Sequence, residues 1–149
     1  MKSFTLKKYS SLSQKEIFHI STDIKNFHKI LPNYFKSLKI IEEKDTEKYV
    51  IEKLKFLHLP IKVKTKHVII KPNIHEVYIL NGPTKGTQFI ETYLSTKNGS
   101  VVTIEVKLVF TGFMKIFWFL EDYVEKKMRK VMNEFISSAE KYYSISNFN

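Results

Sequence analysis

An alternating segment followed by a long helical segment constrains the fold of this chain most strongly. Residues 101–110 alternate between apolar and polar side chains, which predicts a strand, and Thr111-Gly112 ends this pattern. The spacing from about Phe113 to Tyr143 predicts a helix with an apolar face of Phe117, Leu120, Val124, Met128, Val131, Phe135, Ala139 and Tyr142. Its polar face carries Lys115, Asp122, Lys126, Arg129, Lys130, Asn133, Ser137 and Lys141. Such a helix must bury its apolar face against a sheet, and a sheet curved around it can enclose a cavity, where we expect the function.

The residues before this segment predict strands and two short helices. Residues 3–9 predict the first strand, and Ser13 with Glu16 has the spacing of a capping box that opens a helix through about Thr22. Asp23 can cap a second short helix, which Pro32 ends. Six strands follow, at residues 38–43, 49–56, 61–70, 75–80, 87–95 and 101–110. We expect one α+β domain spanning residues 1–149.

Composition excludes several classes of protein. The chain has no cysteine, so disulfides, thiolate catalysis and cysteine-ligated zinc are excluded. Its net charge of +10 comes almost entirely from lysine, with Arg129 the single arginine, so a nucleic-acid partner is not expected. The same lysine-rich composition suits a thermophilic source. The sequence shows no signal peptide, membrane-spanning run, metal-ligand spacing or cofactor motif, and we expect a cytoplasmic protein without cofactors.

The order of the elements and three segments carry a family resemblance. The segments are residues 21–32 (STDIKNFHKILP), residues 81–87 (NGPTKGT) and the terminal helix. On these features the chain resembles the helix-grip superfamily, which includes Bet v 1-like and START-related proteins, polyketide cyclases and coenzyme Q-binding proteins. The resemblance implies a curved seven-stranded antiparallel sheet that wraps the long helix over a cavity, which holds an apolar small molecule or lipid. The turn at residues 44–48 lacks the glycine-rich loop of the Bet v 1 pattern, so no plant-type ligand is implied.

Strand parity indicates which side chains of the last hairpin face the helix. The apolar face of the last strand consists of Val102, Ile104, Val106, Leu108 and Phe110. A two-residue turn at Asn98-Gly99 would place Tyr93 opposite Ile104 and Glu91 opposite Val106. Directly paired residues share a face, so this turn predicts that Phe89, Glu91 and Tyr93 point inward. A three-residue loop would reverse the parity.

The same reasoning applies to the middle strands. Lysines at 62, 64 and 66 should face water, which turns Val63, Thr65 and His67 inward. A Pro72-Asn73 turn would pair His67 with Tyr78, so Tyr78 and Leu80 would also point inward. Glu52 would point inward from an outer strand, where we expect it to pair with a surface lysine.

The predicted ligand-binding surface is largely apolar with a few polar groups, as in most small-molecule sites. It comprises Val63, Thr65, His67, Tyr78, Phe89, Glu91, Tyr93, Ile104, Val106, Leu108, Phe117, Leu120, Val124 and Met128. Glu91 is a candidate general acid or base, or else a carboxylate that meets lysine, water or solvent. His67 can polarise a ligand carbonyl or shuttle a proton, or simply bond a neighbour in the core. The hydroxyls of Tyr78 and Tyr93 can bond a ligand, although core aromatics need none.

Turns at one end of the sheet predict the mouth of the cavity. Alternate turns of a meander lie at the same end, which brings together Tyr34, Phe35, Leu57, His58, Leu59, Gly82, Pro83 and Phe113. These residues could gate ligand entry, contact a partner or pack as ordinary loops. Residues 82–86 lack the ending of a phosphate-binding loop and lead into a strand, so no nucleotide site is expected there.

The first turns of the terminal helix are apolar on all sides. Residues 113–120 include six further apolar or aromatic side chains besides Phe117, and only one face of this segment can pack on the sheet. The remainder predicts a homodimer interface, a lid over the mouth or transient contact with a membrane surface.

Three functions remain open from the sequence. The first is a binding module for an apolar small molecule or lipid. The second is an enzyme of the cyclase or dehydratase kind that uses Glu91 and His67 as acid and base. The third is an interaction protein whose cavity is filled by side chains.

Overall fold

One antiparallel sheet and a long helix dominate the computed structural model, which describes residues 2–56 and 58–148, with side chains described except at 113–114 and 146–148. The sheet has seven strands in the order β1-β7-β6-β5-β4-β3-β2. The strands are β1 (Lys2–Ser10), β2 (Phe35–Lys44), β3 (Glu47–Phe56), β4 (Leu59–Ile70), β5 (Ile74–Ile79), β6 (Gln88–Thr96) and β7 (Gly99–Leu108). The predicted α+β class and order of elements are confirmed.

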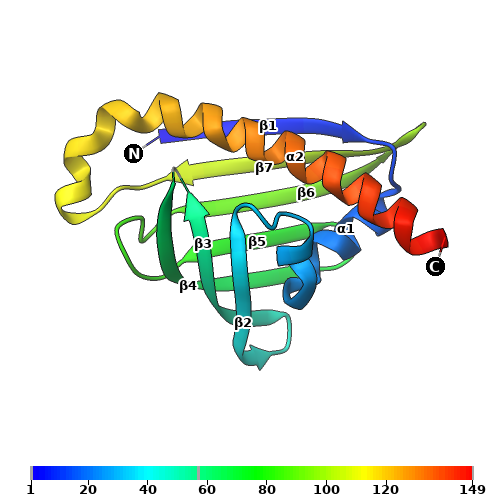
Figure 1. Cartoon of the computed structure of the whole chain (residues 1–149), viewed down its shortest axis with the longest axis horizontal. Coiled ribbons are helices and arrows are strands. Elements are labelled where there is room, and N and C mark those ends of the chain that lie inside the picture. Colours follow the sequence, from blue (N-terminus) through cyan, green and yellow to red (C-terminus); the bar gives the residue numbers. More distant parts are fainter. Residues whose placement is uncertain (1, 57, 149) are drawn as a thin grey trace.

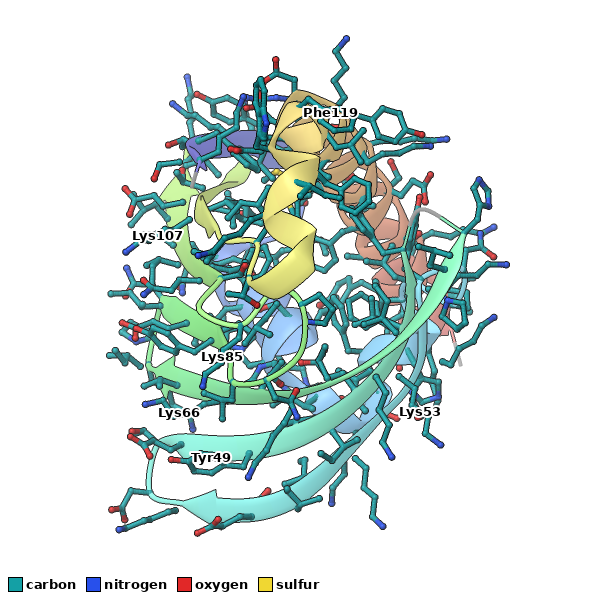
Figure 2. All side chains as sticks on the ribbon, turned by 90° about the vertical axis from the view of Figure 1, so that its left-hand side faces the viewer. Tyr49, Lys53, Lys66, Lys85, Lys107 and Phe119 are labelled. Atoms are coloured by element: carbon teal, nitrogen blue, oxygen red, sulfur yellow. The ribbon has the colours of Figure 1, made fainter. Side chains whose placement is uncertain are left out.

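Four helical segments lie on the concave side of the sheet. They are α1 (Gln14–Thr22), the 3-10 helix η1 (Ile24–Lys29), the 3-10 helix η2 (Gly112–Leu120) and α2 (Glu121–Phe148). Figure 1 shows α2 running across β1 and β7 while α1 covers one end of the strands, and Figure 2 shows the sheet bending around the helices. This curvature places the inner faces of all the central strands toward α1 and α2.

The two short helices lie where the sequence predicts them, and their N-caps differ in hydrogen bonding. Ser13 and Glu16 form the predicted capping box, in which the Ser13 hydroxyl accepts from the Glu16 N–H at 3.1 Å. Asp23 is at the N-cap position of the second helix as predicted, but its carboxylate makes no capping hydrogen bond and accepts from Asn26 Nδ2 at 2.9 Å. That helix is a 3-10 turn that ends at Lys29, before Pro32.

The terminal helix differs from the single α-helix that the spacing predicts. Residues 112–120 form η2, with non-helical torsions at Phe117, and only from Glu121 is the helix regular. The buried residues of α2 are Val124, Met132, Phe135, Ile136 and Ala139. Tyr142 is 38% exposed, because the end of α2 projects past the strands. All eight residues of the predicted polar face are exposed.

Polar contacts near both ends of α2 fix its position on the sheet. Lys2 of β1 pairs with Asp122, and its Nζ also lies 3.5 Å from Glu125 Oε1. Toward the other end, the Ser11 N–H donates to Glu140 Oε2 at 3.1 Å. Between these contacts the backbone of α2 lies close to β1, whereas the backbone of α1 lies close to β6 and β7.

Two hairpin registers differ from the sequence prediction, with different consequences. In β6–β7, Thr96 pairs with Gly99, so Tyr93 lies opposite Val102 and Glu91 opposite Ile104. Each pairing is two residues away from the predicted one, and an even shift leaves every side chain on its predicted face. In β4–β5, Ile70 pairs with Ile74 across a three-residue turn, which reverses the parity of β5.

The reversed parity of β5 corrects one predicted site residue and adds another. His67 lies opposite Val77 rather than Tyr78, and Tyr78 instead pairs with Lys66. The Tyr78 ring therefore lies on the outer face, where the Lys66 Nζ is 5.2 Å from its centroid. Leu80 follows the end of β5 and does not extend its inner face. His75 takes the inward position and is buried.

Candidate functional site

A continuous chain of buried polar side chains crosses the inner face of four neighbouring strands. It begins on β6 with Tyr93, whose hydroxyl donates to Glu91 Oε1 at 2.6 Å. His75 Nδ1 on β5 lies 2.9 Å from the same Glu91 oxygen, and His75 Nε2 lies 2.8 Å from His67 Nδ1 on β4. The two imidazole rings are stacked with centroids 5.1 Å apart. The chain thus joins four titratable groups on three strands and continues to a fourth strand.

The far end of the chain is a second carboxylate. His67 Nε2 lies 3.1 Å from Glu52 Oε2 on β3 and 3.1 Å from the Thr65 hydroxyl, which itself donates to Glu52. Glu52, Thr65 and His67 are each buried. The order Glu52–His67–His75–Glu91 is a carboxylate–imidazole–imidazole–carboxylate relay, and we call these four residues the relay.

Strand register places the relay diagonally across the sheet. Tyr93 pairs with Val102 near the α1 end, where its ring meets Phe18 edge-on at 5.5 Å. Glu91 pairs with His75 closer to the opposite end, while Glu52 pairs with Val63 in the middle of β3. The relay therefore runs from the region near α1 to the middle of β3.

The environment of Glu91 favours its ionised form. Burial acts to raise the pKa of Glu91, but the charge and hydrogen bond of His75, the hydrogen bond from Tyr93 and the charge of His67 together hold that pKa below its ordinary value of 4.5. Burial, followed by the charge of Glu91, raises the pKa of Tyr93 well above its ordinary value, so its hydroxyl remains a donor. The Glu91 carboxylate is thus an ionised acceptor at neutral pH.

Glu91 is the end of the relay that stays accessible. Its side chain is 17% exposed, whereas those of His75, His67 and Glu52 are 4%, 6% and 6% exposed. Both described hydrogen bonds to Glu91 go to Oε1, which leaves Oε2 without a partner among the described residues. A carboxylate oxygen with free lone pairs can accept a hydrogen bond or a proton from a bound molecule.

The structure brings together most of the polar residues that the sequence selected and adds one. Glu91 and His67 are on the inner face as predicted, where Glu91 contacts Tyr93 and His75. Glu52 was expected to pair with a surface lysine, and this is wrong, because it is buried and bonded to Thr65 and His67. His75 was missed because its inward position depends on the three-residue turn of β4–β5. The cis Lys71-Pro72 bond lies in that turn and gives no reliable signal in the sequence.

The apolar part of the predicted surface divides into buried and half-buried residues. Among the inward-facing positions that are buried are Val63, Val102, Val106, Leu108 and Val124. Those that remain half-buried are Phe89, Ile104, Phe117, Leu120 and Met128. Ile104 lies opposite Glu91 in the middle of β7, so its residual exposure is not that of a strand end, whereas Phe89 lies opposite Val106 near the start of β6.

Two surface hollows lie away from the relay and from α2. One lies on the outer face of β1, β7 and β6 and is lined by Ser3, Thr5, Gln88, Ile90, Glu105 and Lys107, among others. The other lies between the short helices and β2, β3 and β4, with His19, Asp23, Ile40, Lys48 and Ile69 among its lining. Neither includes a relay residue, so the expected cavity beneath α2 stays a prediction.

The predicted mouth is partly assembled. The Thr111 N–H donates to the Pro83 carbonyl at 2.8 Å, which joins the β5–β6 loop, with Gly82, to the start of η2. Tyr34 and Phe35 lie beside the last residues of β3, since the Lys55 N–H donates to the Tyr34 carbonyl at 2.6 Å. His58 and Leu59 are exposed. The predicted mouth residue Leu57 and the side chain of Phe113 lie outside the described residues.

The described residues contain neither a grouped metal site nor a membrane-spanning helix. Within residues 2–56 and 58–148, no three or more histidine and acidic side chains are grouped so as to hold a metal ion. Within those ranges no helix combines the length and the apolar character needed to span a bilayer.

Comparison with solved structures assigns the fold. The chain superposes on an aromatase/cyclase from Streptomyces sp. R1128 with a TM-score of 0.77, 12% identity and coverage of 94% of both chains. It superposes on a START superfamily protein from Mycobacterium smegmatis with a TM-score of 0.76, 10% identity and coverage of 95% of this chain and 97% of the other. The chain has the helix-grip fold. Norcoclaurine synthase from Thalictrum flavum shares it with a TM-score of 0.71, 16% identity and coverage of 95% and 92%.

Sequence comparison adds nothing to this result, since neither a family model nor a curated protein matches the chain. At these identities the helix-grip likeness establishes the fold alone. The relay has to be interpreted from its own geometry.

Proposed function

We propose that this helix-grip domain binds an apolar small molecule or lipid between the concave face of the sheet and α2. The observation that carries the proposal is the half-buried state of Ile104, which points inward from the middle of β7, and of Phe89, which points inward near the start of β6. In a close-packed core such side chains would be covered completely. A bound apolar molecule would cover them and be stabilised by about 25 cal/mol for each Å² removed from water.

Ligand capture and a matched pair of variants test this proposal. Native mass spectrometry of the freshly purified protein, with solvent extraction of the same sample, should reveal a retained apolar compound. Binding of 2-methoxynaphthalene, a neutral fluorescent probe, should weaken at least about tenfold in Ile104→Trp, because the indole would occupy the site. Thr103→Trp, on the opposite face of the same strand, should leave binding unchanged. No retained compound, no probe binding, or equal effects of both variants would contradict the proposal and favour a filled interior.

A second candidate function is acid–base catalysis in the same space. It is supported by the relay, because His75 joins Glu91 to His67, the two residues expected to serve as base and acid. An ionised carboxylate beside an apolar surface can remove a proton from a carbon next to a carbonyl and return it to a neighbouring atom. The cyclase and dehydratase reactions considered from the sequence require such a transfer.

Proton exchange into a model ketone tests the second candidate. In D₂O the protein should speed deuterium incorporation beside the carbonyl of 2-tetralone, as followed by NMR. Glu91→Gln and His67→Ala should each lose this exchange while still binding 2-methoxynaphthalene. Exchange at the uncatalysed rate in the wild-type protein would leave binding as the function.

Exposed apolar side chains around η2 support a partner at this end of the domain. Ile116, Trp118 and Phe119 are 64%, 69% and 61% exposed, and Tyr123 at the start of α2 is 48% exposed. We propose that this patch contacts a second copy of the chain, because exposed aromatic side chains of this size are typical of protein interfaces. Light scattering should give the mass of a dimer, and Trp118→Lys should restore the monomer. A monomeric wild type that sediments with anionic vesicles would assign the patch to a membrane surface instead.

A further inference from the structure

The relay carries information about the ligand that the apolar surface does not. We infer that Glu52, His67, His75 and Glu91 form a single unit with a net charge of −1 that offers an acceptor oxygen to the interior, so the ligand carries an O–H or N–H donor and is not an anion. This inference rests on the proposed binding function and deepens it, because it separates phenols, alcohols and amines from free fatty acids.

The net charge follows from counting protons in the hydrogen bonds. The relay contains three contacts, Glu52–His67, His67–His75 and His75–Glu91, at 3.1, 2.8 and 2.9 Å. Each contact needs one proton between its two heavy atoms, so the relay holds three. Two neutral imidazoles supply only two, and the third makes one of the pair an imidazolium. Two carboxylates and one imidazolium give a net charge of −1.

The donors next to both carboxylates are already in use. The Tyr93 hydroxyl donates to Glu91 Oε1, and the Thr65 hydroxyl donates to Glu52 Oε2. The lowered pKa of Glu91 agrees with an ionised carboxylate whose remaining oxygen, Oε2, has no described partner. A molecule that reaches Glu91 therefore meets an acceptor without a spare donor, which selects a ligand that donates.

One lysine near the relay, Lys48 of β3, has the parity of the inner face because it pairs with His67, and its Nζ lies 3.8 Å from Glu43 Oε1. Lys62, Lys64 and Lys66 of β4 have the parity of the outer face, opposite to that of His67. The charged groups that act on Glu91 are His75 and His67, both members of the relay. Around Glu91 the charged neighbours are thus members of the relay, while the three lysines of β4 lie on the outer face.

A second negative charge against this surface would be unfavourable. Moving an anionic carboxylate out of water costs several kcal/mol unless a cation or donors compensate for the lost solvation. The ionised Glu91 would add repulsion at close range. A neutral hydroxyl or a protonated amine gains a charge-assisted hydrogen bond at the same place.

Three related fluorescent probes test the inference on the intact protein at pH 7. They share a naphthalene ring: 2-naphthol has a donor, 2-methoxynaphthalene has none and 2-naphthoate is an anion. We expect 2-naphthol to bind at least about tenfold more tightly than 2-methoxynaphthalene, because a hydrogen bond to a charged group contributes about 1.5–3 kcal/mol. We expect 2-naphthoate to bind at least about tenfold more weakly than 2-methoxynaphthalene.

A matched pair of variants assigns these preferences to Glu91. Glu91→Gln should remove the preference for 2-naphthol and admit 2-naphthoate, while binding 2-methoxynaphthalene as the wild type does. Glu76→Gln is the control, because Glu76 on the outer face accepts a tyrosine hydroxyl at the same 2.6 Å, from Tyr78. The control variant should keep all three wild-type affinities.

The outcomes separate failure of the inference from failure of the proposed function. Equal affinities for 2-naphthol and 2-methoxynaphthalene, tighter binding of 2-naphthoate, or preferences retained in Glu91→Gln would overturn the inference alone. Binding of none of the three probes would overturn the proposed function and the inference with it.

A measurement on the wild-type protein guards against a Glu91→Gln variant that does not fold. In ¹⁵N NMR of labelled histidine, three of the four ring nitrogens of His67 and His75 should be protonated. Two protonated nitrogens would mean that Glu52 or Glu91 holds the third proton or that a contact is broken, and would overturn the assignment of an imidazolium between two ionised carboxylates.

Discussion

The Tyr93 hydroxyl offers the sharpest test of how the relay is held together. Tyr93 is 1% exposed and donates to Glu91 at 2.6 Å, and its ring packs edge-on against Phe18. Tyr93→Phe keeps the ring and this packing, and removes only the hydroxyl. A hydrogen bond to an ionised partner contributes about 1.5–3 kcal/mol, so we expect the free energy of unfolding to fall by that amount.

Tyr78 supplies a matched control in the neighbouring strand. Its hydroxyl also donates at 2.6 Å to the glutamate two residues earlier, Glu76, but on the outer face of the sheet. Water can replace that hydroxyl as a donor to Glu76, so Tyr78→Phe should cost no more than about 0.5 kcal/mol.

Urea denaturation at pH 7 measures the loss of unfolding free energy in Tyr93→Phe and in Tyr78→Phe, provided that this free energy falls with urea concentration at the same slope in both variants. In a double-mutant cycle, Tyr93→Phe should cost far less in a Glu91→Gln background, where the carboxylate is absent. Equal losses for the two tyrosine variants, or no coupling between Tyr93 and Glu91, would refute the reasoning that Glu91 is an ionised group stabilised by its neighbours.

Three further predictions concern pH and local geometry. The folded-state pKa of Glu91 is lowered, so ionised Glu91 should stabilise the fold above its ordinary pKa of 4.5, and this stabilisation should be lost as the pH falls below that value. The urea midpoints of the wild type and Glu91→Gln should therefore converge in acid. A difference between the two midpoints that does not change with pH would contradict this. Gly99→Ala should lower the free energy of unfolding by about 3 kcal/mol, because the added Cβ would lie 2.1 Å from the Ser10 carbonyl oxygen. Gly112→Ala should lower it by about 1 kcal/mol, because its Cβ would meet nothing within 4 Å but the residue has a φ of +61°. A thermal melt in which Gly112→Ala is the less stable variant would refute the clash at Gly99. Ser13→Ala should cost about 1 kcal/mol by the same measurement through loss of the capping box, and an unchanged midpoint would show that water replaces the Ser13 hydroxyl.

The sequence determined the order of elements and most of the faces. Alternation in β7 and the helical spacing before Ala139 are local properties, set by the period of each backbone, so they identified the sheet and the helix that covers it. The same local rule predicted an inward Glu91, although the hairpin pairs two residues away from expectation. The prediction of an inward Glu91 is correct despite the register error, because a shift of two residues preserves the face of every side chain.

Only the tertiary structure decided which polar groups meet. The three-residue turn between β4 and β5 turns His75 inward and Tyr78 outward, and one residue more or less in that turn would exchange them. Glu52 and Glu91 are separated by two strands, and His67 and His75 connect them only because the curved sheet aligns four strands in register. A hydrogen-bonded relay depends on distances of about 3 Å between residues far apart in the chain, and periodicity along a single strand holds no information about them.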